Sequence, residues 1–148
     1  MKRTQLKRTR IKNKMTLAEY KAQLNKGRKS KYGAKSCVVD GITYASGLER
    51  THHNELMLLE KAGLISDLEF QPKPVELTIP ARQTMFKPDF RYVENGQVVY
   101  TDTKGAETAR WRDVKKAWRH SGPAVMRVVK AAGKDRTRTT EEIPAAKE

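Results

Sequence analysis

Three residues that could act together on a phosphate lie near one another in the sequence: Asp89, Asp102 and Lys104. Two neighbouring carboxylates repel each other, and a hard divalent cation such as Mg²⁺ relieves that repulsion by taking oxygen ligands. An ammonium group beside them could hold a phosphate or a water molecule. These residue types therefore point to metal-assisted hydrolysis of a phosphodiester bond.

A predicted β-hairpin would bring these residues together. Its arms, residues 86–93 and 98–105, are rich in β-branched and aromatic side chains, and Asn95-Gly96 between them is a strong hairpin signal. Because side chains at i and i+2 of a strand point to the same face, we expect Asp102 and Lys104 to point together. Folding at the turn returns the first aspartate to their side.

The spacing of Pro88-Asp89 and Asp102-Thr103-Lys104 resembles the PD-(D/E)XK nuclease superfamily. That superfamily places a further acidic residue on a helix before the hairpin, and Glu49 opens such a helix here. The chain also looks like the junction-resolving endonuclease I of T-odd phages, and residues 58–72 resemble short phage-encoded nucleases. The likeness to endonuclease I covers roughly residues 32–130, through the segments Tyr32-Gly33-Ala34-Lys35, Ser46-Gly47-Leu48-Glu49, Pro88-Asp89-Phe90 and Thr103-Lys104-Gly105.

The resemblance implies a restriction-endonuclease-like α/β fold, a mixed β-sheet flanked by helices, and an Mg²⁺-dependent DNA endonuclease in which Mn²⁺ could substitute. It implies a catalytic set of Glu49, Asp89, Asp102 and Lys104, and metal ligation by the three acids and the Thr103 carbonyl. Beside two carboxylates the ammonium of Lys104 should stay charged, so we expect it to stabilise the transition state rather than act as a base. The phage resolvases carry glutamate where Asp102 stands, one methylene longer.

Each acidic residue also has a purely structural interpretation. Ser46-x-x-Glu49 is a capping box, in which Glu49 would only bond the Ser46 amide. Asp89 could cap the turn after a proline, and Asp102 could be an exposed acid paired with Lys104. Both interpretations stay open at this point.

Several neighbouring polar residues are expected to be less important. His52 and His53 lie one turn after Glu49, and we expect them at the surface; the alternative is that His53, four residues after Glu49, approaches the metal or a phosphate. Gln71 could hydrogen-bond near the site. We take Asp67 and Glu76 as surface acids.

The net charge of +14 is unevenly distributed. Residues 1–31 hold 12 Lys and Arg against one acid, a net +11, whereas the remaining 117 residues carry +3. A basic arm indicates a polyanionic partner, most simply DNA; a solvated tail or a ribosomal-type extension is the alternative. On the body we expect DNA-backbone contacts from Lys35, Arg110, Arg112, Lys115, Lys116 and Arg119.

The periodicity predicts three regions: a basic arm at 1–31 with a short helix at 17–25, a nuclease domain at 32–130, and a charged tail at 131–148 that frays. The elements expected in the domain are a hairpin at 37–44, a helix from Ser46 to Ala62, strands at 68–70 and 75–79, a loop at 81–85, the hairpin above, a helix at 108–120 and a strand at 124–129. The last strand should pair in parallel with the one before it. The first helix should bury Leu48, Leu56, Leu59 and Ala62, and the second Trp111, Val114 and Trp118.

Composition excludes several classes of protein. The single cysteine, Cys37, rules out an internal disulfide and a cysteine-based metal cluster. No apolar run approaches a membrane span, so we expect a protein of the cytoplasm, the host's if it is phage-encoded. Nothing indicates a nucleotide cofactor.

The function that we expect is cleavage of branched DNA such as a four-way junction, by a homodimer, and this substrate rests on the resemblance. Two alternatives remain: a nicking or homing-type nuclease acting on duplex DNA, and a non-catalytic nucleic-acid-binding protein on the same fold.

Overall fold

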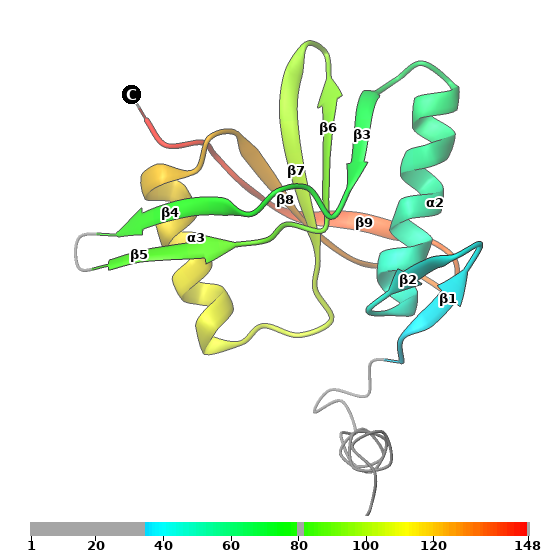
Figure 1. Cartoon of the computed structure of the whole chain (residues 1–148), viewed down its shortest axis with the longest axis horizontal. Coiled ribbons are helices and arrows are strands. Elements are labelled where there is room, and N and C mark those ends of the chain that lie inside the picture. Colours follow the sequence, from blue (N-terminus) through cyan, green and yellow to red (C-terminus); the bar gives the residue numbers. More distant parts are fainter. Residues whose placement is uncertain (1–34, 80–81, 148) are drawn as a thin grey trace, which may run out of the picture. The chain divides into compact units, whose positions relative to one another are not determined.

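The computed structural model describes residues 35–79 and 82–147 (Figure 1). The chain divides into two units, residues 1–31 and 32–148, and the description below concerns the second. The basic arm and the helix predicted at 17–25 lie outside the described residues.

A five-stranded mixed sheet with two helices forms the centre of the α/β fold. Strand β7 pairs in parallel with β8, as predicted from the crossover helix between them, and the other three pairings are antiparallel. The strand order is β3-β6-β7-β8-β9, with bounds Ser66–Phe70, Phe90–Glu94, Gln97–Thr103, Val125–Ala131 and Thr137–Ile143.

The central hairpin forms as the sequence predicted. Asn95 and Gly96 have φ values of 51° and 75°, so both residues of the turn adopt the left-handed conformation that matches the twist of the flanking strands. Phe90 lies opposite Thr101, and Glu94 lies opposite Gln97. Residues 86–89 of the predicted arm precede strand β6.

Two small hairpins complete the set of strands: β1 (Cys37–Val39) with β2 (Ile42–Tyr44), and β4 (Val75–Ile79) with β5 (Arg82–Phe86). The first was predicted. The loop expected at 81–85 is wrong, because most of that segment is strand β5. From Gln83 on, exposed positions of β5 alternate with partly buried ones. A strand with one solvent-exposed face can be rich in polar residues, which is why the segment has the composition of a loop.

Helix α2 (Gly47–Lys61) begins at the predicted cap, where the Ser46 hydroxyl accepts a hydrogen bond from the Glu49 amide. Helix α3 (Ala109–Ser121) is capped in the same way by Thr108. The two helices lie on either side of the sheet (Figure 1). Within the described residues no helix is long and apolar enough to cross a membrane.

Two apolar clusters occupy the two faces of the sheet. Neighbouring residues Val99 and Tyr100 of β7 pack against different clusters, as strand alternation requires. The α3 side buries Leu77, Trp111, Val114, Ala117, Trp118, Met126, Val128 and Ile143, and the α2 side buries Leu56, Ile65, Phe90, Tyr92 and Val99.

The expectation that residues 131–148 fray is wrong. Residues 137–143 form β9, which pairs with β8 and buries Ile143 completely. The segment Thr137–Ile143 is mostly polar, and an edge strand of this kind needs only one buried apolar anchor to dock.

The buried stripe predicted for α2 is also wrong in part. Leu59 is 37% exposed, and Ala62 is exposed, whereas Leu56 is buried as expected. The other buried residues of the helix are polar: Glu49, His52 and His53. The helix therefore turns a polar surface toward the sheet near its N-terminus.

Candidate functional site

Asp102 and Lys104 end strand β7 and point together, as predicted. Asp102 is 1% exposed, and its Oδ2 forms an ion pair with the ammonium of Lys104. The same ammonium lies 4.6 Å from the centre of the Trp111 ring on α3, a cation–π contact. Asp102 is therefore a buried carboxylate and not the exposed strand acid of the structural interpretation.

Asp89 comes back to the end of β7 through the hairpin. Its Oδ2 accepts hydrogen bonds of 2.7 Å from both the amide and the hydroxyl of Thr103. Its carbonyl accepts a 2.7 Å bond from the amide of Gln71, which adopts the left-handed conformation with φ 50°. A non-glycine residue in that region is uncommon, and here it directs the end of β3 toward Asp89.

Glu49 serves the helix cap and faces the site at once. It is 3% exposed, and its Oε2 accepts a 2.5 Å bond from the amide of Ala45, one residue before the cap. A backbone hydrogen bond from Ser46, the one that the capping box predicted, also acts on this carboxylate. The charge of Asp89 acts on it too, so the carboxylate faces the site while it serves the cap.

The charge of Asp89 acts on the ionisation of Asp102 and of Glu49. Burial, and next the charge of Asp89, raise the pKa of Asp102 to about 7, while Lys104 opposes the shift. Burial also raises the pKa of Glu49; the Ala45 amide opposes this, Asp89 adds to it, and a hydrogen bond from Gln71 lowers it. Mutual repulsion of this kind marks a candidate functional site.

These acids approach the end of β7 from two sides. Asp102 and Lys104 point toward α3, as the contact with Trp111 shows, whereas Thr101 and Thr103 point the other way. Accordingly, no three acidic, histidine or cysteine side chains of residues 35–79 and 82–147 form a cluster with metal-binding geometry. The donor chemistry of the set, buried carboxylate oxygens that repel one another, nevertheless suits a hard divalent cation. The role of the Thr103 carbonyl as a ligand stays a prediction.

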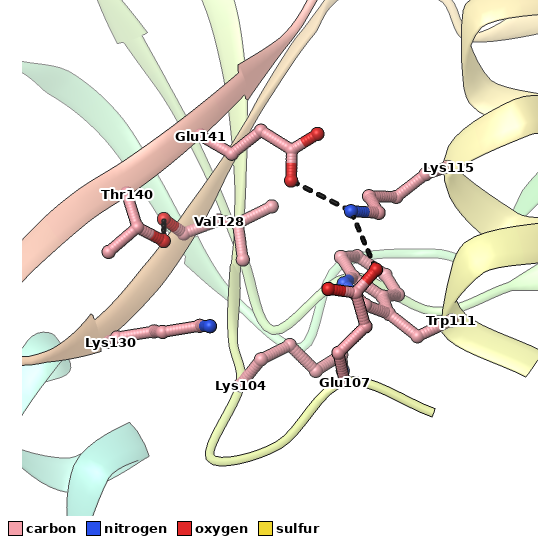
Figure 2. A pocket seen from close by; sticks show the side chains of 8 residues that line it. All are labelled: Lys104, Glu107, Trp111, Lys115, Val128, Lys130, Thr140 and Glu141. Atoms are coloured by element: carbon pink, nitrogen blue, oxygen red, sulfur yellow. Dashed lines mark hydrogen bonds and ion pairs between the residues drawn. The ribbon is translucent and has the colours of Figure 1, made fainter. Parts of the chain in front are cut away.

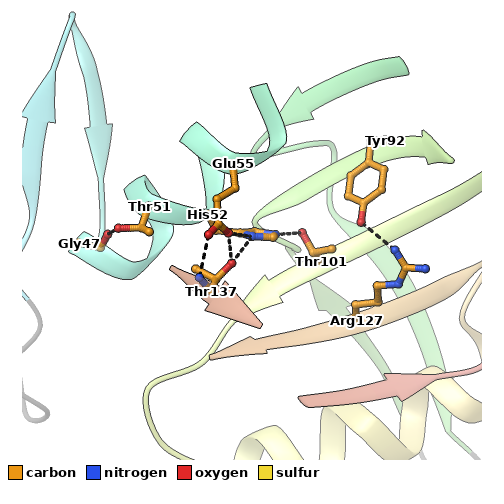
Figure 3. A network of polar contacts seen from close by, with 8 residues as sticks. All are labelled: Gly47, Thr51, His52, Glu55, Tyr92, Thr101, Arg127 and Thr137. Atoms are coloured by element: carbon orange, nitrogen blue, oxygen red, sulfur yellow. Dashed lines mark hydrogen bonds and ion pairs between the residues drawn. The ribbon is translucent and has the colours of Figure 1, made fainter. Parts of the chain in front are cut away.

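The expectation that His52 and His53 lie at the surface is wrong, because both are buried, with 7% and 6% exposure. Figure 3 shows His52 between strands β7 and β9: its Nε2 is 3.1 Å from the Thr101 hydroxyl, and its Nδ1 is 3.1 Å from the Thr137 hydroxyl. The Thr137 hydroxyl donates to Glu55, so the ring must donate from Nδ1 and accept at Nε2. Burial lowers the pKa of His52, which favours this neutral form.

His53 lies on the same buried face of α2 but has other polar partners. Its Nδ1 is 2.8 Å from the Tyr44 hydroxyl, and its ring stacks on Phe70 with centroids 5.1 Å apart. Burial lowers its pKa as well. A helical stripe counted from Glu49 passes through positions 52, 53 and 56, so the spacing contained the signal for both histidines.

The basic residues predicted to contact DNA differ in availability. Lys115 pairs with Glu107 at 3.0 Å and Glu141 at 2.8 Å, and Arg119 pairs with Glu141 at 3.0 Å. The others are exposed: Lys35, Arg110, Arg112 and Lys116.

A family model described as "protein of unknown function (DUF1064)" matches residues 29–133. The chain belongs to the DUF1064 family. No curated protein matches it. The matched segment contains Glu49, Asp89, Asp102 and Lys104, so the whole candidate site lies within the part that defines the family, while β9 lies outside it. Membership assigns no activity, and the resemblance to PD-(D/E)XK nucleases stays a proposal.

Proposed function

We propose that this protein is a metal-dependent DNA endonuclease of the PD-(D/E)XK type that hydrolyses phosphodiester bonds. The observation that carries the proposal is the buried pair of Asp102 and Lys104 at the end of β7, with the charge of Asp89 acting on it. A buried carboxylate with a pKa near neutrality costs folding free energy. Such a cost is common where a protein keeps charged groups for chemistry.

Each residue has a distinct role in this proposal. Asp89 and Asp102 would hold the cation, with Glu49 contributing from the start of α2. A divalent ion such as Mg²⁺, when bound, would polarise the phosphate and lower the pKa of a water molecule. Thr103 fixes the orientation of Asp89 through its amide and hydroxyl.

Lys104 would act as an electrostatic group. Its ammonium forms an ion pair with Asp102 and lies 4.6 Å from the centre of the Trp111 ring on α3. A fixed positive charge at this position stabilises the extra negative charge of a phosphoryl transition state.

Branched DNA is the proposed substrate, and a homodimer follows because a four-way junction has two strands to cut. Both points rest on the resemblance to the phage resolvases. The alternative on the same chemistry is a nicking or homing-type enzyme on duplex DNA.

A cleavage assay tests the proposal. Purified protein is incubated with a four-way junction and with the matching linear duplex, with Mg²⁺, with Mn²⁺ and with EDTA. We expect cleavage only with the divalent ion, and faster on the junction. Equal rates on both DNAs would favour the duplex-nicking alternative and remove the resolvase assignment.

A non-catalytic nucleic-acid-binding role is favoured by one observation. In the described residues the acids form no three-ligand cluster, since Asp89 bonds Thr103 and Asp102 pairs with Lys104. Tight DNA binding with no cleavage under any metal condition would establish this role in place of the nuclease.

A further inference from the structure

A small cavity lies next to the candidate site, on the α3 side of the sheet. It has a volume of about 130 Å³. Figure 2 shows side chains entering it from the end of β7, from α3, and from strands β8 and β9. Lys104 belongs both to this cavity and to the candidate site, so the two share a wall.

The charges in the cavity are not balanced evenly. Lys115 pairs with Glu107 and Glu141, Arg119 pairs with Glu141 as well, and Lys104 is paired with Asp102, so these cations and carboxylates balance. Lys130 extends into the cavity from β8 (Figure 2) and has no carboxylate within ion-pair distance among the described residues. Of the three lysines that line the cavity, Lys130 is therefore the one without an ion-pair partner among the described residues.

A second positively charged side chain, that of Arg138, lies beside Lys130. Lys130 on β8 is directly opposite Arg138 on β9 in the antiparallel register, so the two side chains emerge on the same face. Like charges opposite each other destabilise a sheet. Arg138 is exposed, and it too has no ion-pair partner in the described part of the chain. Two strands thus place two cations together, at a cost in stability, where an anion would relieve the repulsion.

The backbone connects this cation pair to the candidate site. The Lys104 amide donates a 2.9 Å bond to the carbonyl of Val129, the residue before Lys130. The ends of β7 and β8 are thereby held side by side. A DNA strand whose scissile phosphate lies at Lys104 can continue along these strand ends to Lys130.

We propose that this cavity binds a backbone phosphate of the DNA strand, next to the scissile phosphate, and that Lys130 holds it with Arg138 at the rim. The inference rests on the proposed function for the position of the scissile phosphate. The phosphate binding itself does not require catalysis. The wall formed by Glu107, Lys115 and Glu141 has two carboxylates against one ammonium, a formal charge of −1, so the bound phosphate sits toward the Lys130 side.

The first test measures DNA binding without metal ion, so that cleavage plays no part. Fluorescence anisotropy of a labelled duplex is recorded over a salt series for the parent, Lys130→Ala, Lys130→Arg, Arg138→Ala and the control Lys61→Ala. Lys61 is an exposed lysine in the last turn of α2, so its substitution removes the same charge elsewhere. Thermal unfolding of each variant verifies folding, and Lys130→Gln replaces Lys130→Ala if that variant does not fold.

We expect Lys130→Ala to weaken binding and to lower the slope of log K against log salt by about 0.9, the value for one lost phosphate contact to duplex DNA. Lys130→Arg should keep the parent slope, and Lys61→Ala should leave it unchanged. Equal behaviour of Lys130→Ala and Lys61→Ala, or a parent that does not bind DNA, would overturn the proposal. A parent that binds but never cleaves would remove the nuclease and leave this test intact.

A second test locates the contact. Duplexes that each carry one uncharged methylphosphonate, placed in turn along one strand, are bound by the parent and by Lys130→Ala. We expect one position, adjacent to the cleaved bond, where the neutral group weakens the parent but no longer affects Lys130→Ala. Strictly additive losses at every position would contradict a direct contact between Lys130 and a phosphate.

Discussion

Helices α2 and α3 pack on the same sheet but bury different kinds of side chain. The buried residues of α3 are all apolar: Trp111, Val114, Ala117 and Trp118. Those of α2 are Glu49, His52, His53 and Leu56, three polar residues and one leucine. A buried polar group contributes little net stability even when it is hydrogen-bonded, whereas a buried aromatic ring contributes much. The α3 side therefore serves mainly to stabilise the fold, and the α2 side mainly to position polar groups.

The polar side chains buried on the α2 side nevertheless form a connected network of hydrogen bonds. His52 links α2 to Thr101 on β7 and Thr137 on β9, and Glu55 accepts a 2.8 Å bond from the Thr137 amide (Figure 3). These contacts fix the helix that carries Glu49 against the strand that carries Asp102. Strand β9 therefore contributes to both faces of the sheet. Thr137 bonds His52 on the α2 side, and Ile143 belongs to the apolar cluster on the α3 side.

The largest effect on stability should come from the α3 side. Trp118 is fully buried, and its indole N–H donates a 2.8 Å bond to the Ala124 carbonyl. Trp118→Ala should lower the free energy of unfolding by about 3–5 kcal/mol, because it leaves a cavity and an unpaired carbonyl. Denaturant unfolding of the parent and of Trp118→Ala measures this loss of unfolding free energy. A loss below about 1 kcal/mol would contradict the assignment of this helix to the stable side.

The sequence predicted the apolar side better than the polar one. Trp111, Val114 and Trp118 follow a clear helical period, and Asn95-Gly96 fixes the central hairpin, so both could be predicted. His52 and His53 could not be placed by hydrophobicity, because their burial depends on partners such as Thr101 and Tyr44 from distant parts of the chain.

In the candidate site, too, local sequence patterns predicted some contacts and missed those that depend on distant parts of the chain. The pairing of Asp102 with Lys104 follows from strand alternation, and it was predicted. The position of Asp89 against the Thr103 amide and hydroxyl depends on the exact register of β6 with β7. Strand β9 was missed because an edge strand with one apolar anchor has the composition of a tail.

At the end of β7, the burial of Asp102 should cost stability in a pH-dependent way. Its folded pKa is about 7 and its ordinary value is 3.8, so the folded state favours the protonated acid. The free energy of unfolding contributed by this group should therefore be highest below pH 4 and fall as the pH rises to about 7. With 1.36 kcal/mol per pKa unit, the loss is about 4 kcal/mol.

The Asp102→Asn variant isolates this contribution. Its stability should exceed that of the parent at pH 8, and the difference should shrink toward pH 4, measured by urea unfolding without divalent ions. A difference that is constant with pH would mean that Asp102 has the same pKa in the folded and the unfolded state, and that Lys104 compensates fully for its burial.

Catalysis gives the third prediction. Asp89→Asn keeps an oxygen that can accept the two bonds from Thr103, so folding should be little affected, but the charge is lost. We expect the Mg²⁺-dependent cleavage rate to fall by about 10²–10³-fold, the range seen when one group that stabilises the transition state is removed. DNA binding should change much less. Near-parent turnover would remove Asp89 from the site and with it the proposed nuclease.

The smallest effect on stability is expected at the start of α2. There, substitution of Glu49 can separate its two proposed roles, helix cap and metal ligand. A helix cap needs only a hydrogen-bond acceptor, which glutamine supplies, whereas a metal ligand needs the charge. Glu49→Gln should keep the bond from the Ala45 amide and the stability of the parent, but lose most of the Mg²⁺-dependent nicking.

Ser46→Ala is the matched variant, because it removes the hydroxyl that accepts the Glu49 amide and leaves the carboxylate in place. It should cost about 1 kcal/mol of stability and keep its activity well below the melting temperature. Thermal unfolding and plasmid nicking are measured on both variants. If Glu49→Gln nicks DNA at the parent rate, the polar side of α2 only caps and supports the fold. The chemistry then belongs to Asp89, Asp102 and Lys104 alone.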